Sequence, residues 1–190
     1  MGSLEVICGC MWAGKSEELL RRVKRCILSG TKVLLFKPDI DTRYSEDSVV
    51  THDGNSLKCN TVPRRITPKD IEEFGEADVY AFDECTLFEG SFLDVVRHLI
   101  HKGKRVIVAG LDLNFRGEPF GIMPALLAYA DKIDKLTAIC PKCGKEATRT
   151  QRIFNGQPIT NGKEVVVGGA GTYEPRCKDC FVWEEPKILR

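Results

Sequence analysis

One eight-residue loop constrains what this chain can fold into more than any other feature. Residues 9–16 read Gly-Cys-Met-Trp-Ala-Gly-Lys-Ser, which completes the pattern G-x-x-x-x-G-K-[ST]. An apolar, strand-like run at 4–8 precedes it, and apolar residues recur after it at 19, 20, 23, 26 and 27, which is helical spacing. A strand, a glycine-containing loop and a helix in this order predict a phosphate-binding loop. The alternative is a chance match in a turn.

This loop predicts a nucleotide-binding site made from backbone groups and two side chains. The N-terminus of the following helix offers free N–H groups to an anion. Lys15 is expected to reach the β- and γ-phosphates of a nucleotide, and the Ser16 hydroxyl to bind Mg²⁺. The residues predicted to bind the nucleotide here are Gly9, Cys10, Met11, Trp12, Ala13, Gly14, Lys15 and Ser16.

Short apolar runs alternate with helical patterns through the first two thirds of the chain. The strands are predicted at 4–8, 32–37, 79–83 and 105–110, and the helices at 16–28, 68–75, 91–102 and 122–130. This alternation predicts an α/β fold of the P-loop (RecA-like) type, a parallel sheet with helices on both faces. Ligands of such sheets lie at the carboxyl ends of the strands, where residues 9–16, Asp83-Glu84 and Leu111-Asp112 would meet.

Two segments lack a regular pattern. Residues 39–65 are polar and turn-rich, so we expect a long loop or a small hairpin near the site. Residues 154–172 contain five glycines and predict an adaptable loop.

We expect two domains: a nucleotide-binding domain at 1–138 and a small C-terminal zinc-binding lasso domain at 139–190.

Length and charge exclude several classes of function. The chain has 190 residues, enough for one core with a small appendage. Its formal net charge of +1 provides no electrostatic footprint for nucleic acid or for a membrane surface. We expect no secretory signal, and the sequence has no apolar run as long as a membrane span. We therefore expect a cytoplasmic protein with no nucleic-acid or membrane partner.

The nine cysteines fall into two populations. Five are scattered through the first half and predict small core residues or partly exposed thiols. The other four form two C-x-x-C pairs that predict a structural, four-thiolate Zn²⁺ site, and they are Cys140, Cys143, Cys177 and Cys180. The 33 residues between the pairs make this site a clasp around a loop. A redox C-x-x-C motif is the alternative, but such motifs do not normally occur as pairs.

An acidic pair follows one of the predicted strands. Asp83 and Glu84 come directly after the apolar run 79–82, where P-loop enzymes place an aspartate that helps to hold Mg²⁺. The second carboxylate can act as a base toward a hydroxyl or a water. Asp112, after the next strand, is the competing carboxylate, and turns favour aspartate in any case.

Together these features resemble the type II thymidine kinases, a family of small, zinc-containing cytosolic enzymes. The resemblance covers nearly the whole chain. It is carried by the loop 9–16, the four zinc cysteines and a series of shorter stretches, which are Asp41-Thr42-Arg43-Tyr44, Thr51-His52-Asp53, Asp83-Glu84, Leu111-Asp112 with Phe115, Pro119-Phe120-Gly121, 135–138, and Gly168-Gly169 with Tyr173.

The resemblance implies transfer of the γ-phosphoryl group of ATP to the 5′-hydroxyl of deoxythymidine. It implies that Glu84 is the general base, that Asp83 acts on Mg²⁺, and that Asp41 and Arg43 border the phosphates and substrate. The residues that it places around the nucleoside are Met11, Leu87, Leu111, Phe115, Phe120 and Tyr173, with the thymine edge read by the backbone of Glu164, Val165, Val166, Val167 and Gly168. It also implies a homotetramer and feedback inhibition by dTTP.

The chain departs from the family pattern at several positions. Cys10 stands where the family usually has proline, and Thr86 and Leu87 stand where it generally has glutamine and phenylalanine. These changes leave the phosphoryl-transfer residues in place and affect the expected shape of the substrate pocket. The alternatives are a kinase of another pyrimidine deoxynucleoside such as deoxyuridine, a RecA-like ATP-binding switch module, and a zinc-ribbon nucleic-acid protein with an accessory ATP site.

Overall fold

The computed structural model describes residues 1–41, 47–51, 54–166 and 171–183. Its centre is a six-stranded sheet in the order β5-β2-β6-β7-β1-β8, and every neighbouring pair in this sheet is parallel. The six strands are β1 (Ser3–Gly9), β2 (Val33–Pro38), β5 (Asn60–Val62), β6 (Val79–Phe82), β7 (Arg105–Gly110) and β8 (Lys132–Leu136). The α/β prediction is therefore confirmed.

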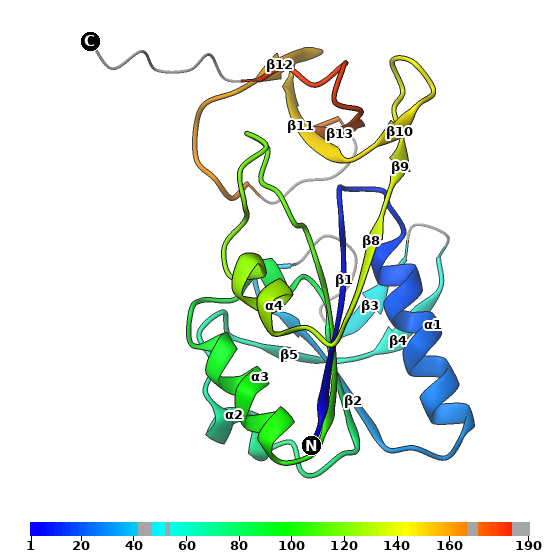
Figure 1. The fold of residues 1–190 in the computed structure, drawn as a ribbon, viewed down its shortest axis with the longest axis vertical. Coiled ribbons are helices and arrows are strands. Elements are labelled where there is room, and N and C mark those ends of the chain that lie inside the picture. The colour runs from blue at the N-terminus through cyan, green and yellow to red at the C-terminus, as the bar shows by residue number, and fades with distance from the viewer. Residues whose placement is uncertain (42–46, 52–53, 167–170, 184–190) are drawn as a thin grey trace.

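Helices cover both faces of this sheet, as Figure 1 shows. Helix α1 lies on one face, and the three shorter helices lie on the other. The helices are α1 (Lys15–Leu28), α2 (Pro68–Glu72), α3 (Phe92–His101) and α4 (Met123–Tyr129). Because side chains alternate along a strand, β1 contributes Val6 to one buried cluster and Ile7 to the other. The sheet thus has an apolar core on each side.

The strand register brings the predicted site residues to one edge. Phe36 pairs with Phe82, and Cys8 pairs with Gly110, so the residues that follow these strands emerge side by side. These are the phosphate-binding loop after β1, Lys37 at the end of β2, and Asp83 after β6. The carboxyl edge of the sheet is therefore the floor of a common site, as expected for this fold.

The structure corrects several element predictions. Strands β5 and β8 belong to the central sheet, but β5 has only three residues and β8 is a charged edge strand, so neither has the apolar run of a buried strand. Helix α2 ends at Glu72, short of the expected 75. Residues 39–65 contain the hairpin β3 (Ser48–Val50) and β4 (Ser56–Lys58) as well as β5. Residues 154–172 are not wholly loop, because β12 (Gln157–Ile159) pairs with β11 (Arg149–Phe154).

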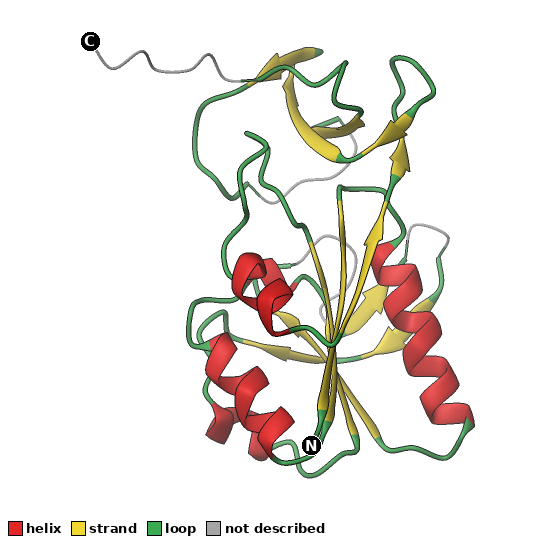
Figure 2. Cartoon of the chain, viewed as in Figure 1, coloured by secondary structure: helices red, strands yellow, loops and turns green. Residues whose placement is uncertain are grey.

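A C-terminal module follows the sheet and lies over its carboxyl edge. It has a two-stranded sheet of β9 (Ala138–Ile139) and β10 (Glu146–Ala147), and a three-stranded sheet of β12, β11 (Arg149–Phe154) and β13 (Tyr173–Arg176). Figure 2 shows that its described part consists of strands and loops. A small cluster that includes Cys10, Ala147 and Cys177 packs the module against the phosphate-binding loop.

None of the helices in the described parts of the chain is both long enough and apolar enough to cross a membrane.

Candidate active site

The phosphate-binding loop depends on glycine at two positions. Gly9 has a φ of 143°, and a Cβ there would lie 2.3 Å from the carbonyl oxygen of Leu136 on β8. Gly14 has a φ of 79° and precedes the first turn of α1. Both conformations are poorly accessible to other residues. Within the loop, Lys15 Nζ donates a hydrogen bond of 2.8 Å to the carbonyl of Cys10, so its ammonium group lies over the concave side of the loop.

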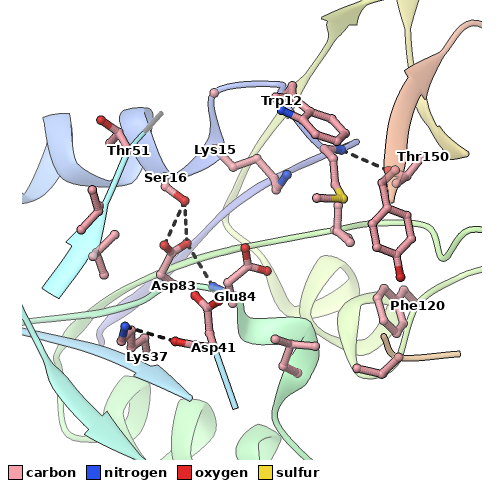
Figure 3. A pocket seen from close by; sticks show the side chains of 18 of the residues that line it. Trp12, Lys15, Ser16, Lys37, Asp41, Thr51, Asp83, Glu84, Phe120 and Thr150 are labelled. Atoms are coloured by element: carbon pink, nitrogen blue, oxygen red, sulfur yellow. Dashed lines mark hydrogen bonds between the residues drawn. The ribbon is translucent and has the colours of Figure 1, made fainter. Parts of the chain in front are cut away.

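Ser16 and Asp83 form the pair of oxygen ligands expected of a magnesium site. The Ser16 hydroxyl donates to both oxygens of the Asp83 carboxylate, at 3.2 and 2.9 Å, and the Glu84 backbone N–H donates to Oδ1 at 3.0 Å (Figure 3). Burial, and then the neighbouring charge of Glu84, raise the pKa of Asp83 from its ordinary value of 3.8 to about 7. A cation beside the Asp83 carboxylate would favour its ionised form. The Ser16 hydroxyl and the Asp83 carboxylate are therefore suitable oxygen ligands for Mg²⁺.

Glu84 lies beside this pair in an unusual backbone conformation. Its φ of 48° and ψ of 41° place it in the left-handed region, immediately before the short 3-10 helix Cys85–Leu87. A non-glycine residue in this region costs of order 1–3 kcal/mol and is often found at functional sites. Its side chain lines the same cavity as Lys15 and Ser16. Glu84 therefore shares the cavity with the residues of the phosphate-binding loop.

Asp112, the competing carboxylate, has a different environment. It is buried after β7, and its Oδ2 forms an ion pair of 2.7 Å with Lys135 Nζ on β8. It does not line the cavity that contains Glu84. An aspartate paired in this way stabilises the contact between neighbouring strand ends, whereas Glu84 lines the cavity.

One cavity brings most of the predicted residues together. It lies between the carboxyl edge of the sheet and the C-terminal module (Figure 3). The predicted site residues that line it are Met11, Trp12, Gly14, Lys15, Ser16, Asp41, Asp83, Glu84, Leu87, Leu111, Phe115, Phe120, Glu164, Val165, Val166 and Tyr173. Gly9, Cys10 and Ala13 belong to the loop but do not line the cavity. Arg43, Val167 and Gly168 lie outside the described residues.

Several lining residues were not predicted. Lys37 is only 3% exposed, and its Nζ donates to the carbonyls of Asp41 (3.2 Å) and Ser48 (3.3 Å). Thr150 on β11 accepts a 3.0 Å hydrogen bond from the backbone N–H of Met11. Asn114 donates to the Glu164 carboxylate at 2.9 Å. The sequence offers a signal only for Lys37, a charged residue at the end of an otherwise apolar strand. The contacts of Asn114 and Thr150 join residues that are 50 and 139 positions apart, so no local pattern indicates them.

The four predicted zinc ligands converge at the base of the C-terminal module. Their sulfur atoms all lie within 4.8 Å of one another, and the Sγ atoms of Cys143 and Cys177 are 3.5 Å apart. Around a tetrahedral zinc ion with Zn–S bonds of about 2.3 Å, sulfur atoms would be roughly 3.8 Å apart. Burial alone would raise the pKa of the Cys140 thiol. Hydrogen bonds from backbone N–H groups, chiefly those of Cys177 and Lys142, outweigh this effect and lower the pKa to about 6. This donor set fits Zn²⁺.

The scattered cysteines behave as the sequence predicted. Cys8, Cys10, Cys26 and Cys85 are buried, and Cys59 is half-buried. Burial raises the pKa of the Cys8 thiol to about 11 and raises that of Cys85 well above its usual range. Protonated, buried thiols of this kind act as small apolar side chains.

The fold and this site define a P-loop α/β protein that carries a four-cysteine, zinc-binding module. A family model described as "Thymidine kinase" matches residues 2–181. The thymidine kinase of Coprothermobacter proteolyticus is 50% identical to the chain over 178 residues, which cover 93% of this chain and 88% of that protein. The chain belongs to the thymidine kinase family.

Proposed function

We propose that this chain transfers the γ-phosphoryl group of ATP to the 5′-hydroxyl of deoxythymidine, which yields dTMP and ADP. The observation that carries the proposal is that the two ends of the cavity between the sheet and the C-terminal module have different linings. Lys15, Ser16 and Asp83 line one end, which provides the cation and the Mg²⁺ ligands that the phosphates of a nucleoside triphosphate require. Phe115, Phe120 and Tyr173 line the other end, which suits a flat pyrimidine base.

Glu84 is the proposed general base. A free 5′-hydroxyl is a weak nucleophile, and a carboxylate within hydrogen-bond reach can accept its proton as the new P–O bond forms. The backbone of Glu84 also fixes the Asp83 carboxylate, so the base and the proposed magnesium ligand are held by one turn. The left-handed conformation of Glu84 directs its carboxylate into the cavity.

The remaining charged residues hold the triphosphate. Lys15 exchanges the Cys10 carbonyl for phosphate oxygens, and the N–H groups at the start of α1 complete the cradle. Mg²⁺ held by Ser16 and Asp83 would neutralise phosphate charge. Asp41 lines the same end, and the family resemblance implies that Arg43 also borders the phosphates. In this arrangement most of the catalysis comes from positioning and electrostatics.

The base is proposed to lie under residues 164–168, whose backbone would read the thymine edge. Glu164, Val165 and Val166 line the cavity, and Val167 and Gly168 are assigned by the resemblance. A purine would need the space that Phe115 and Phe120 occupy, so we expect pyrimidine deoxynucleosides to be preferred. Leu87, in place of the family's phenylalanine, enlarges this end of the cavity.

Further properties are proposals on the strength of the family. We propose a division into a kinase domain, 1–138, and a zinc-binding lasso domain, 139–190, held by a structural zinc ion on Cys140, Cys143, Cys177 and Cys180. We also propose that the chain is a cytoplasmic homotetramer that dTTP inhibits.

The direct test is phosphoryl transfer from ATP to a panel of nucleosides. Thymidine should give the highest kcat/KM, deoxyuridine should be weaker, and the two purine deoxynucleosides should be much poorer acceptors. Equal use of deoxyadenosine or deoxyguanosine would contradict the assignment of the base-binding end, and ATP hydrolysis without any nucleoside acceptor would favour a switch module.

A further inference from the structure

A buried arginine in the C-terminal module has no part in the mechanism described so far. Arg152, on β11, is 5% exposed. Within the described ranges it forms no ion pair, and its partners are carbonyl groups, a hydroxyl and aromatic rings. Burial of a cation without a carboxylate is costly. Its contacts should therefore serve a specific purpose.

The hydrogen bonds of Arg152 all lead to one short segment. Nη1 donates to the carbonyl of Lys163 at 2.5 Å, and Nη2 donates to the carbonyl of Glu164 at 2.9 Å. Nε and Nη2 also donate to the Tyr173 hydroxyl, at 3.2 and 2.9 Å, and that hydroxyl donates to the carbonyl of Val166 at 2.8 Å. One guanidinium group thus holds three carbonyls of this segment, two directly and one through Tyr173.

The same guanidinium group also supports the rings at the nucleoside end of the cavity. Its central carbon lies 3.6 Å from the ring centroid of Phe115 and 5.3 Å from that of Tyr173. Both rings line the cavity, whereas Arg152 lies behind them. A cation over an aromatic face contributes favourably when the site is desolvated. Arg152 therefore connects the rings of the pocket with the segment that covers it.

Residues 162–166 have little packing of their own. Gly162, Lys163, Glu164 and Val166 are exposed, so apolar burial does not hold the backbone in place. Two further side chains assist Arg152, because Arg116 Nη2 donates to the carbonyl of Gly162 and Asn114 donates to the side chain of Glu164. The position of this segment is thus set by side-chain donors, of which Arg152 is the most buried cation.

We propose that Arg152 is a positioning residue for the nucleoside base: it fixes the backbone of residues 163–166 and the Tyr173 ring before the substrate binds. The proposal rests on the proposed function, in which this segment covers the base. Ordering a loop on binding costs conformational entropy, and a loop that is already ordered binds more tightly. Loss of Arg152 should therefore raise the KM for thymidine more than it changes the KM for ATP.

The fork of arginine is needed for this role. A lysine at 152 would keep the charge but could not reach the Lys163 and Glu164 carbonyls and the Tyr173 hydroxyl in one plane. Steady-state kinetics of the zinc-loaded protein should compare Arg152→Met and Arg152→Lys with Arg149→Met. Arg149 is a matched control on the same strand, since its contacts are with Thr148 and with the ring of Trp183.

We expect Arg152→Met to raise the KM for thymidine by roughly tenfold or more, with less than about a twofold change in the KM for ATP. Arg152→Lys should be intermediate, and Arg149→Met should resemble the parent. Tyr173→Phe removes only the hydroxyl relay to Val166, and its effect should be less than multiplicative with that of Arg152→Met. If Arg152→Met does not fold, Arg152→Lys and Tyr173→Phe carry the test.

An unchanged KM for thymidine in folded Arg152 variants would overturn the proposal, as would equal changes in the KM for both substrates. Hydrogen exchange of residues 162–166, measured without any nucleoside, tests the positioning role independently of the proposed function. Faster exchange in Arg152→Met than in Arg149→Met supports the positioning role even if thymidine is not the acceptor, and equal exchange rejects it.

Discussion

The two ends of the cavity are built on different scaffolds. The phosphate end is formed by the ends of strands β1, β2 and β6 of one parallel sheet, with an apolar core on each face. The nucleoside end is covered by a module whose buried interior contains polar side chains, which are Thr150, Gln151, Arg152 and Arg176. The first scaffold is stabilised by burial of apolar surface, and the second by hydrogen bonds and the four-cysteine site.

This difference separates chemistry from recognition. In the core on one face of the sheet, Phe36 and Phe82 stack on each other and Phe92 of α3 meets Phe82 edge-on, and this packing fixes the strand end that precedes Asp83 and Glu84. In the module, exposed backbone is held by a few long-range side-chain donors. Changes in the sheet edge should therefore act on kcat, and changes in the module should act on the affinity for the nucleoside.

The largest effect should come from Lys15→Ala. Lys15 is the single lysine of the phosphate-binding loop. Without its ammonium group, the negative charge of the γ-phosphoryl group is left uncompensated. We expect kinase activity to fall to background while the circular dichroism spectrum and melting temperature stay close to those of the parent. Near-normal turnover by the folded variant would remove the basis for placing the phosphates at the sheet edge.

Glu84→Gln should lower kcat by roughly 10²-fold or more, because a positioned base is lost while its shape remains. Nucleotide affinity should persist, since Ser16 and Asp83 are unchanged. Asp112→Asn is the comparison, because Asp112 is paired with Lys135 away from the cavity. Rapid-quench or steady-state turnover measures both. A crippled Asp112→Asn beside an active Glu84→Gln would mean that the wrong carboxylate has been assigned.

Asp83 should make the phosphate end sensitive to pH. Its pKa is raised to about 7, so the ligand-free folded protein holds a proton there that the unfolded chain releases near 3.8. Stability from this group is therefore present below about pH 4 and is lost as pH rises toward 7. Affinity for Mg²⁺ with nucleotide should rise over the same range, because binding requires the carboxylate.

The variant Asp83→Asn should abolish both trends. Denaturant unfolding of the ligand-free protein between pH 5 and 8 should show the variant gaining stability relative to the parent as pH rises. The exposed Asp94→Asn on α3 serves as the control, since its side chain is 70% exposed. A constant difference between Asp83→Asn and the parent across this range would contradict the raised pKa.

A smaller effect is expected from Leu87→Phe. Leu87 lines the cavity from the sheet side, and a phenylalanine there restores the aromatic ring of the family pattern. Filling this space should increase the preference for thymidine over bulkier pyrimidine analogues by a factor of about 10, the usual scale for one apolar contact in a pocket. Competition between nucleosides measures the ratio, and an unchanged ratio would show that Leu87 does not set the size of the pocket.

The sequence predicted the phosphate end in more detail than the nucleoside end. Lys15, Ser16 and Asp83 follow strands that are visible as apolar runs, so their convergence could be expected from the fold. The four-cysteine site could also be predicted, because zinc sites of this kind have a characteristic spacing of their cysteine ligands. By contrast, Arg152 acquires its role from contacts with the Phe115 ring and the Tyr173 hydroxyl, which lie in other segments of the chain, and strand β8 is a charged edge without apolar periodicity. No local pattern encodes such contacts.

Removal of zinc tests the separation of the two scaffolds most directly. After chelation, calorimetric binding should show thymidine affinity falling by roughly tenfold or more, while affinity for ATP with Mg²⁺ changes by less than about threefold, since residues 144–176 loosen first. Readdition of zinc should restore both values. Equal loss of the two affinities, or an unchanged affinity for thymidine in protein shown by elemental analysis to lack zinc, would contradict the account.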